Sequence, residues 1–117
     1  MTKKAWTIYI IENKLGMNYC GICTNLSRRF YEHASNSKLC AKALRGKGPL
    51  TLKYATEVDS HSNALKTELW LKKQTKASKL KIIAGTLPLP LENNTFEQAQ
   101  LDLIQFEVHN KIQNNKT

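Results

Sequence analysis

Residues 19–33 have the sequence YCGICTNLSRRFYEH, which changes in character after its sixth residue. The first six residues are mostly apolar and predict a short strand. Asn25 follows as a typical N-cap residue. Leu26, Phe30 and Ala34 then recur at the four-residue spacing of the buried stripe of a helix. The sequence therefore predicts a strand that leads directly into a short helix.

An arginine and a histidine lie along one flank of this predicted helix. Arg29 and His33 are four residues apart, so they stack beside the buried stripe, at the border between core and solvent. Arg28 and Glu32 turn outward. A solvated basic face is the ordinary explanation, but a side-chain pair at the edge of a core is well placed to meet an anion.

The segment before residue 19 predicts the other half of a β-hairpin. Residues 5–12 (AWTIYIIE) are β-branched and aromatic, and turn residues follow them. With the turn centred near Lys14, Tyr9 falls near Tyr19, and both phenols share one face of the sheet. Gly21 lies on that face and would leave open space where a substrate backbone approaches. From the hairpin alone, an ordinary structural role for these residues is favoured.

Two segments carry the candidate residues farther along the chain. Residues 35–48 form a basic loop suited to phosphate contacts, and residues 50–58 predict a third strand. A helix over residues 61–74 follows, with an apolar arc of Ala64, Leu65, Leu69 and Leu71.

Glu68 projects into the middle of that arc. A carboxylate that faces a core is costly unless it is paired or binds a cation. An ion pair with Lys72 at the rim of the helix is an equally weighted alternative, which needs no function.

The C-terminal part predicts two more helices. Residues 78–84 form a short helix that Gly85 ends, and the extended connector LPLPL occupies residues 87–91. The capping-box pattern TFEQ at residues 95–98 opens the last helix. We expect one domain over residues 1–85, and a connector and helix over residues 86–117 that pack on this domain, a second copy or a protein partner.

Composition points to a polyanionic partner. The chain has 117 residues, with 18 Lys and Arg against 9 Asp and Glu, for a net charge of +9. Such an excess favours nucleic acid, although solubility alone is the simpler alternative, and charge does not distinguish DNA from RNA. The three cysteines form no zinc motif, and Cys20 and Cys23 fit a core in a reducing compartment. With no signal peptide and no apolar run of about 20 residues, we expect a cytoplasmic protein without a membrane segment.

These motifs, in this order, resemble the GIY-YIG nuclease superfamily, and within it the small single-domain bacterial members. The two motifs are Thr7-Ile8-Tyr9 and Tyr19-Cys20-Gly21, and the resemblance spans about residues 5–85. Thr7 stands where the family has glycine and Cys20 where isoleucine is usual; both are structural positions. No appended DNA-targeting domain is present, which leaves the substrate specificity open.

The resemblance implies an α/β (α+β) fold, with a small three-stranded antiparallel or mixed sheet flanked by helices and a C-terminal helical extension. It implies an endonuclease that cleaves DNA, including branched or damaged DNA in repair or recombination, with one Mg²⁺ or Mn²⁺ ion. Tyr9 and Tyr19 are then the motif tyrosines, Arg29 the catalytic arginine, His33 an accessory catalytic residue, Glu68 the metal ligand and Gly21 a structural residue of the site. The general base stays open among Tyr9, Tyr19 and His33. The nucleic-acid contacts expected from charge are Lys42, Arg45, Lys47, Lys72 and Lys73. An inactive nucleic-acid-binding module with the same fold is the alternative.

Overall fold

The computed structural model describes residues 5–115 and has an α+β architecture built on one antiparallel sheet. The strands are β1 (Trp6–Glu12), β2 (Asn18–Cys23), β3 (Thr51–Val58) and β4 (Asn94–Thr95), in the spatial order β2-β1-β3-β4. The helices are α1 (Leu26–Ala34), α2 (His61–Lys72), α3 (Lys76–Ile83) and α4 (Gln98–Asn114). Strand β1 is paired on both edges, and residues 7–11 of it are buried on both faces of the sheet.

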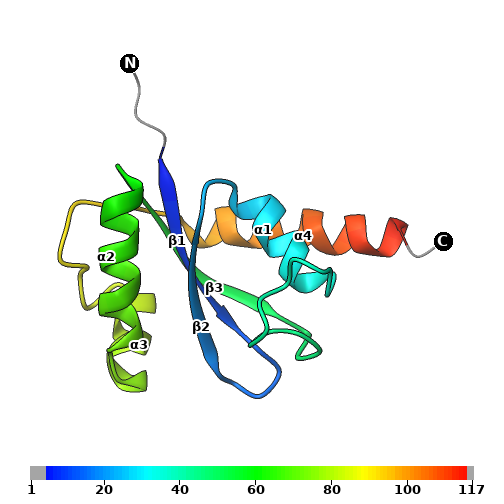
Figure 1. The fold of residues 1–117 in the computed structure, drawn as a ribbon, viewed down its shortest axis with the longest axis horizontal. Coiled ribbons are helices and arrows are strands. Elements are labelled where there is room, and N and C mark those ends of the chain that lie inside the picture. Colours follow the sequence, from blue (N-terminus) through cyan, green and yellow to red (C-terminus); the bar gives the residue numbers. More distant parts are fainter. Residues whose placement is uncertain (1–4, 116–117) are drawn as a thin grey trace.

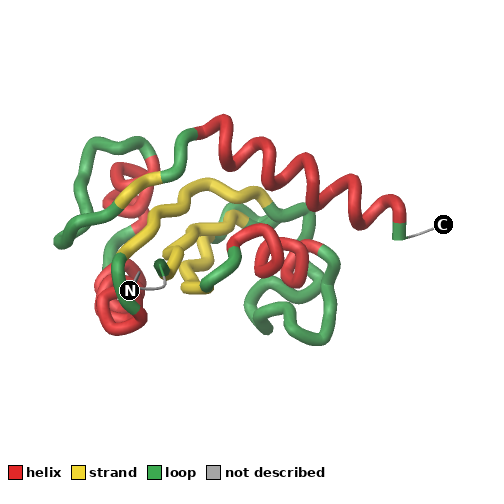
Figure 2. The backbone as a smooth tube through the Cα atoms, turned by 90° about the horizontal axis from the view of Figure 1, so that it is seen from above, coloured by secondary structure: helices red, strands yellow, loops and turns green. Residues whose placement is uncertain are grey.

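Helices cover the two faces of the sheet in pairs (Figures 1 and 2). On one face, Tyr9 and Ile11 pack with Phe30 of α1 and Leu101 of α4. On the other face lie α2 and α3, whose buried side chains meet the alternate residues of β1, such as Ile10. The period of two along β1 therefore separates two cores, and Tyr9 belongs to the α1 and α4 side.

The β1–β2 hairpin forms, but its register differs from the sequence prediction. Tyr9 lies opposite Gly21, and Tyr19 lies opposite Ile11. The reason is the turn, where buried Asn13 accepts hydrogen bonds from the backbone N–H groups of Leu15 (2.9 Å) and Met17 (3.1 Å) and so moves the turn centre along the chain. The register slips by an even number of residues, so both tyrosines still share one face.

Two further corrections concern the end of the chain. The sheet has a fourth strand, because the Phe96 backbone N–H donates to the carbonyl of Ala55 and the Thr95 hydroxyl lies beside that of Thr56. The last helix consequently starts later than predicted: Glu97 is its N-cap and forms the capping box with Gln100. The predicted box began at Thr95, which is in the strand instead.

Helix α2 turns a different face to the sheet than its leucines suggested. Ala64, Thr67 and Leu71 are buried, whereas Leu65 and Leu69 are 41% and 58% exposed. The buried residues have the i, i+3, i+7 spacing of one helical face, and the polar Thr67 joins it because its hydroxyl donates to the Asn63 carbonyl at 2.8 Å. Of the predicted apolar arc, Ala64 and Leu71 are confirmed as buried, whereas Leu65 and Leu69 were wrong.

The burial predicted for Cys20 and Cys23 is confirmed. Cys20, Cys23 and Cys40 are all free and buried. Among residues 5–115, none of the helices combines the length and hydropathy that a membrane span requires.

Candidate active site

Three residues from separate elements form a hydrogen-bonded chain at the centre of the α1 face. The hydroxyl of Tyr9 on β1 lies 2.9 Å from Nε2 of His33 on α1. On the other side of the ring, the backbone N–H of Ala41 donates to Nδ1 of His33 at 3.1 Å. Tyr9 and His33 are 1% and 2% exposed, so His33 lies in the core and not at the border that its helix position predicted.

The Ala41 hydrogen bond fixes the tautomer of His33. Because Nδ1 accepts a hydrogen bond, a neutral ring carries its hydrogen on Nε2. His33 therefore donates from Nε2 to the Tyr9 oxygen. Burial, followed by the charge of Arg29, lowers the His33 pKa to about 4, so the ring is neutral at neutral pH.

The Tyr9 phenol is held in its neutral form. Burial raises its pKa well above the usual value, with a further contribution from Tyr19, while a hydrogen bond from Arg29 opposes the shift. The Arg29 hydrogen bond would stabilise a phenolate, but the effect of burial on the Tyr9 pKa is larger than that of this hydrogen bond.

Gly21 supports the position of this phenol from below. A Cβ atom at residue 21 would overlap the Tyr9 hydroxyl and its ring carbon Cζ. The space beside Gly21, predicted to admit a substrate backbone, is therefore filled by the Tyr9 ring. Glycine is required here because the ring lies directly on the neighbouring strand.

Arg29 is anchored at the rim of the same cluster. One guanidinium nitrogen, Nη1, donates to the Glu32 carboxylate at 2.9 Å and to the Leu39 carbonyl at 2.7 Å. Glu32 faces this arginine and is only 17% exposed in its side chain, in contrast to the outward position predicted for it. An arginine has five N–H donors, so these two bonds leave others for a ligand.

The segment after α1 was predicted as a basic loop for phosphate contacts, but its role in holding Arg29 and His33 was missed. The Leu39 carbonyl holds Arg29, the Ala41 N–H holds His33, and the Cys40 thiol donates to the His33 carbonyl at 3.4 Å. Two of these three contacts use backbone groups, which every residue has, so the sequence could not single out these positions. Burial of Cys40 in the core is the only side-chain signal.

Tyr19 completes the cluster and is more accessible. Its ring centroid lies 6.3 Å from that of Tyr9 and 5.8 Å from that of His33. The side chain is only partly buried, unlike those of Tyr9 and His33. The structure thus brings together Tyr9, Tyr19, Arg29 and His33, with Tyr19 toward solvent.

Glu68 lies apart from this cluster, on the helix that covers the opposite face. Its carboxylate is 3.7 Å from the Lys72 ammonium and its side chain is 17% exposed. Its charge acts on Cys20, which lies between Tyr19 and Gly21 on β2. The phenols are on the α1 and α4 face of the sheet and Glu68 is on α2 at the opposite face, so the sheet separates them. Within the described part of the chain, no group of three or more His, Cys, Asp or Glu side chains gathers as a metal site.

The predicted basic contacts lie on two separate segments. Lys42, Arg45 and Lys47 belong to the loop after α1, where Arg45 donates to the carbonyls of Lys38 and Cys40. Lys72 and Lys73 are exposed at the end of α2. Arg45 thus helps to shape the loop that holds the site.

Comparison with known proteins places this arrangement in a family. A model of the GIY-YIG catalytic domain matches residues 5–81, which include β1, β2, α1 and α2. The chain belongs to the GIY-YIG family. Membership implies nuclease activity in general, with nucleic acid as the substrate.

Relatives of similar size share most of the chain. A UPF0213 protein of Vibrio parahaemolyticus is 35% identical over 89 residues, which are 76% of this chain and 82% of the relative. A GIY-YIG domain-containing protein of Invertebrate iridescent virus 6 is 44% identical over 82 residues, covering 69% and 81% of the two chains. The solution structure of a UPF0213 protein of Bacillus halodurans is 31% identical, covers 68% of this chain and 83% of its own, and has a TM-score of 0.45.

Proposed function

We propose that this protein is a metal-dependent endonuclease that hydrolyses phosphodiester bonds in DNA, including branched or damaged DNA. The observation that carries the proposal is the cluster on the α1 face, where the Tyr9 hydroxyl lies 2.9 Å from His33 and the Tyr19 ring lies beside both. Arg29 stands at its rim as a cation for the phosphate.

Arg29 would bind the scissile phosphate. Its forked guanidinium can donate to two phosphate oxygens and stabilise the charge that develops as water attacks. The hydrogen bonds from Nη1 to Glu32 and to the Leu39 carbonyl fix the direction of the guanidinium before a substrate arrives. Such preorganisation lowers the cost of reorganising donors during the reaction.

The phenol that contacts the attacking water is that of Tyr19. His33 is unsuited to remove a proton, because Nδ1 is occupied by the Ala41 N–H and Nε2 carries a hydrogen. Tyr9 is almost completely buried. Tyr19 is therefore the base or the water-orienting group, while Tyr9 and His33 hold its surroundings in place.

Glu68 fits the role of a metal ligand as a single carboxylate. Mg²⁺ keeps several water molecules and needs only one or two protein carboxylates together with substrate phosphates. The partly exposed Glu68 carboxylate meets this requirement once it leaves the Lys72 ammonium. A bound divalent ion supplies Lewis-acid stabilisation of charge on the phosphate.

The test is cleavage of branched, single-stranded and duplex DNA by purified protein with Mg²⁺ or Mn²⁺. We expect Arg29→Ala and Glu68→Gln to lose activity by at least about 100-fold, the loss typical when a transition-state contact is removed. Asp102→Asn, an exposed change on α4, serves as the control and should stay active. Cleavage that survives both site substitutions would assign the activity to a contaminant.

One observation supports an inactive binding module as the second candidate. Glu68 is paired with Lys72 and lies on the other side of the sheet from the phenols. A binding module predicts DNA affinity that falls steeply with salt, but no turnover with any divalent ion. The cleavage assay therefore separates the two candidates directly.

A further inference from the structure

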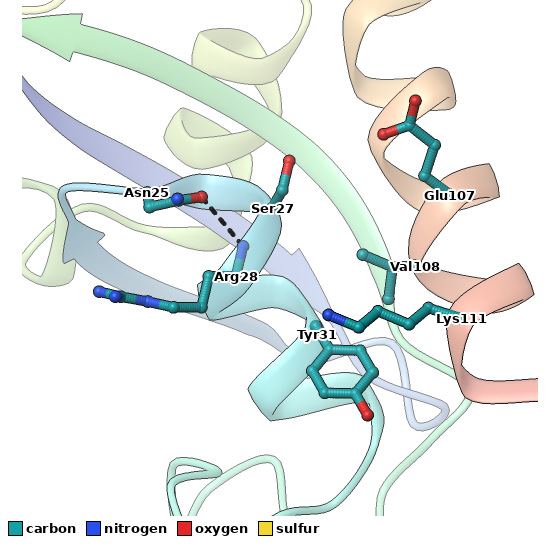
Figure 3. A pocket seen from close by; sticks show the side chains of 7 residues that line it. All are labelled: Asn25, Ser27, Arg28, Tyr31, Glu107, Val108 and Lys111. Carbon is teal, nitrogen blue, oxygen red and sulfur yellow. Dashed lines mark hydrogen bonds between the residues drawn. The ribbon is translucent and has the colours of Figure 1, made fainter. Parts of the chain in front are cut away.

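A pocket lies between α1 and α4 (Figure 3). Its volume is about 290 Å³. It is lined from the first helix by Asn25, Ser27, Arg28 and Tyr31, and from the last by Glu107, Val108 and Lys111. Residues 107–111 lie outside the part that matches the family model, so α4 adds one complete wall to this pocket.

Lys111 is the pocket's most constrained cation. Its side chain reaches from α4 toward α1, and its ammonium lies 4.6 Å from the centroid of the Tyr31 ring (Figure 3). Among residues 5–115, no carboxylate lies within ion-pair distance of it. A cation held over an aromatic face keeps its position without being neutralised, and it remains able to bind an anion.

The wall from α1 adds no negative charge to the pocket. The first turn of α1 contains no acidic residue, and the Ser27 hydroxyl is exposed there. Arg28 has a side chain that is 68% exposed and meets Glu32 only at 4.0 Å. Figure 3 shows the Arg28 guanidinium on the outer side of α1 and the Glu107 carboxylate directed away from the Lys111 ammonium.

The pocket and the candidate active site share helix α1. Arg28 lines the pocket, and the next residue, Arg29, is anchored in the active-site cluster. Successive helix residues point about 100° apart, so α1 presents one flank to each place. Ser27 and Tyr31, which line the pocket, are each two residues from Arg29 and therefore lie on the opposite side of α1. The pocket would thus meet a part of the DNA that lies across α1 from the scissile phosphate.

We propose that the α1–α4 pocket binds a second backbone phosphate of the bound DNA, away from the scissile one, with Lys111 as its main cation. This inference rests on the proposed function for the identity of the strand. The C-terminal helix is then part of the substrate surface as well as of the core.

The experiment measures binding of a fluorescent duplex DNA by anisotropy in EDTA, where no turnover occurs. Lys111→Met keeps an alkyl chain over Tyr31 but removes the charge. We expect it to weaken binding about fivefold and to reduce the salt slope by about one unit, as loss of one phosphate contact does. Glu107→Gln, one turn away on the same helix, should instead tighten binding, because it removes a negative charge from the pocket.

These variants separate the outcomes. A purely structural role for α4 would give Lys111→Met the affinity and salt slope of the wild type, which would overturn the proposal. Lack of DNA binding by the wild type would overturn it as well. Binding that depends on Lys111 in a protein that cleaves no DNA would keep the pocket and refute the nuclease.

Discussion

The Tyr9 hydroxyl has a fixed place in the core because two neighbours act on it from different sides. His33 donates a hydrogen bond to the Tyr9 oxygen. The Tyr9 ring lies over Gly21, where no side chain fits. Replacing Tyr9 by Phe keeps the ring but leaves the buried Nε2–H of His33 without its acceptor. Such a loss costs about 1–3 kcal/mol.

We therefore expect Tyr9→Phe to reduce the free energy of unfolding by that amount in urea denaturation. Tyr19→Phe is the matched control, because Tyr19 is partly exposed and its hydroxyl is nearer to water. Its effect on stability should be smaller and its effect on cleavage larger. Equal effects of the two substitutions on both properties would contradict the roles proposed for the two phenols.

Gly21→Ala tests the contact from the other side. The added methyl group would overlap the Tyr9 hydroxyl, so the ring must move and the hydrogen bond with His33 must lengthen. We expect a loss of about 1–3 kcal/mol in stability, as for other overpacked sites. Gly48→Ala is the control, since a Cβ there meets only the Leu50 nitrogen at 3.9 Å. A Gly21→Ala protein as stable as Gly48→Ala would show that the ring is free to move.

Stability should also depend on pH through His33. Its pKa falls from 6.5 to about 4 on folding, so between these values the unfolded chain binds more protons than the folded protein. Stability is therefore fully present above pH 6.5 and is lost as the pH falls toward 4. The loss amounts to something on the order of 3 kcal/mol.

The measurement is the free energy of unfolding of the wild type and of His33→Gln between pH 4 and 7. The glutamine does not titrate, so the free energy of unfolding of the variant should vary less across this window. At pH 7 the variant should be less stable than the wild type. Parallel curves for the two proteins would show that His33 is not buried in its neutral form.

At the scale of elements, the contacts of α4 make it part of the fold. Leu101 and Val108 are 3% and 4% exposed and lie in the same core as Tyr9. The side chain of Gln105 accepts from the Leu52 backbone N–H of β3 at 2.9 Å, and Asn115 donates to the Tyr31 hydroxyl at 2.9 Å.

Leu101→Ala should cost about 2–5 kcal/mol, as the removal of a fully buried leucine does. Leu103→Ala, two residues away and 56% exposed, should have almost no effect on stability. Thermal unfolding of the two variants compares them at the same helix propensity. Two equally small shifts would mean that the last helix unfolds independently of the sheet.

The sequence predicts a helix or strand when the residues that determine it lie within that segment. It does not predict a feature that depends on pairing with a distant part of the chain. The cap at Asn25 is confirmed, because a cap is determined by the residues next to it. The strand at residues 94–95 could not be predicted, since two exposed residues become a strand only through pairing with β3. The predicted register of β1 and β2 was wrong for a similar reason, because the register depends on how Asn13 binds the turn backbone.

The same distinction applies to the residues of the candidate site. Spacing placed Tyr9 and Tyr19 on one face and set Arg29 beside His33, since strand and helix periods are fixed by geometry. The Ala41 N–H that fixes the His33 tautomer left no trace in the sequence, because any residue could supply it. The position of Glu68 also depends on which face of α2 meets the sheet, and that face differed from the prediction.

At the scale of the whole molecule, the net charge of +9 acts together with the position of its sources. Lys72 and Lys73 end α2 next to Glu68, whereas Lys111 and Arg28 lie on the α1 side. At about 0.1 M salt, fields are screened within about 10 Å, so only cations near the bound strand should contribute strongly.

The last prediction separates contact from net charge. In EDTA, the double variant Lys72→Ala and Lys73→Ala should reduce the slope of log affinity against log salt by about two units if both lysines contact phosphates. The double variant Lys53→Ala and Lys66→Ala removes the same charge from β3 and the middle of α2, and it should leave the slope nearly unchanged. Equal reductions in the two variants would mean that the field of the whole molecule, and not these contacts, holds the DNA. A larger reduction of the salt slope in the Lys72 and Lys73 variant would place the DNA strand across the edge of the sheet, beside both Glu68 and Tyr19.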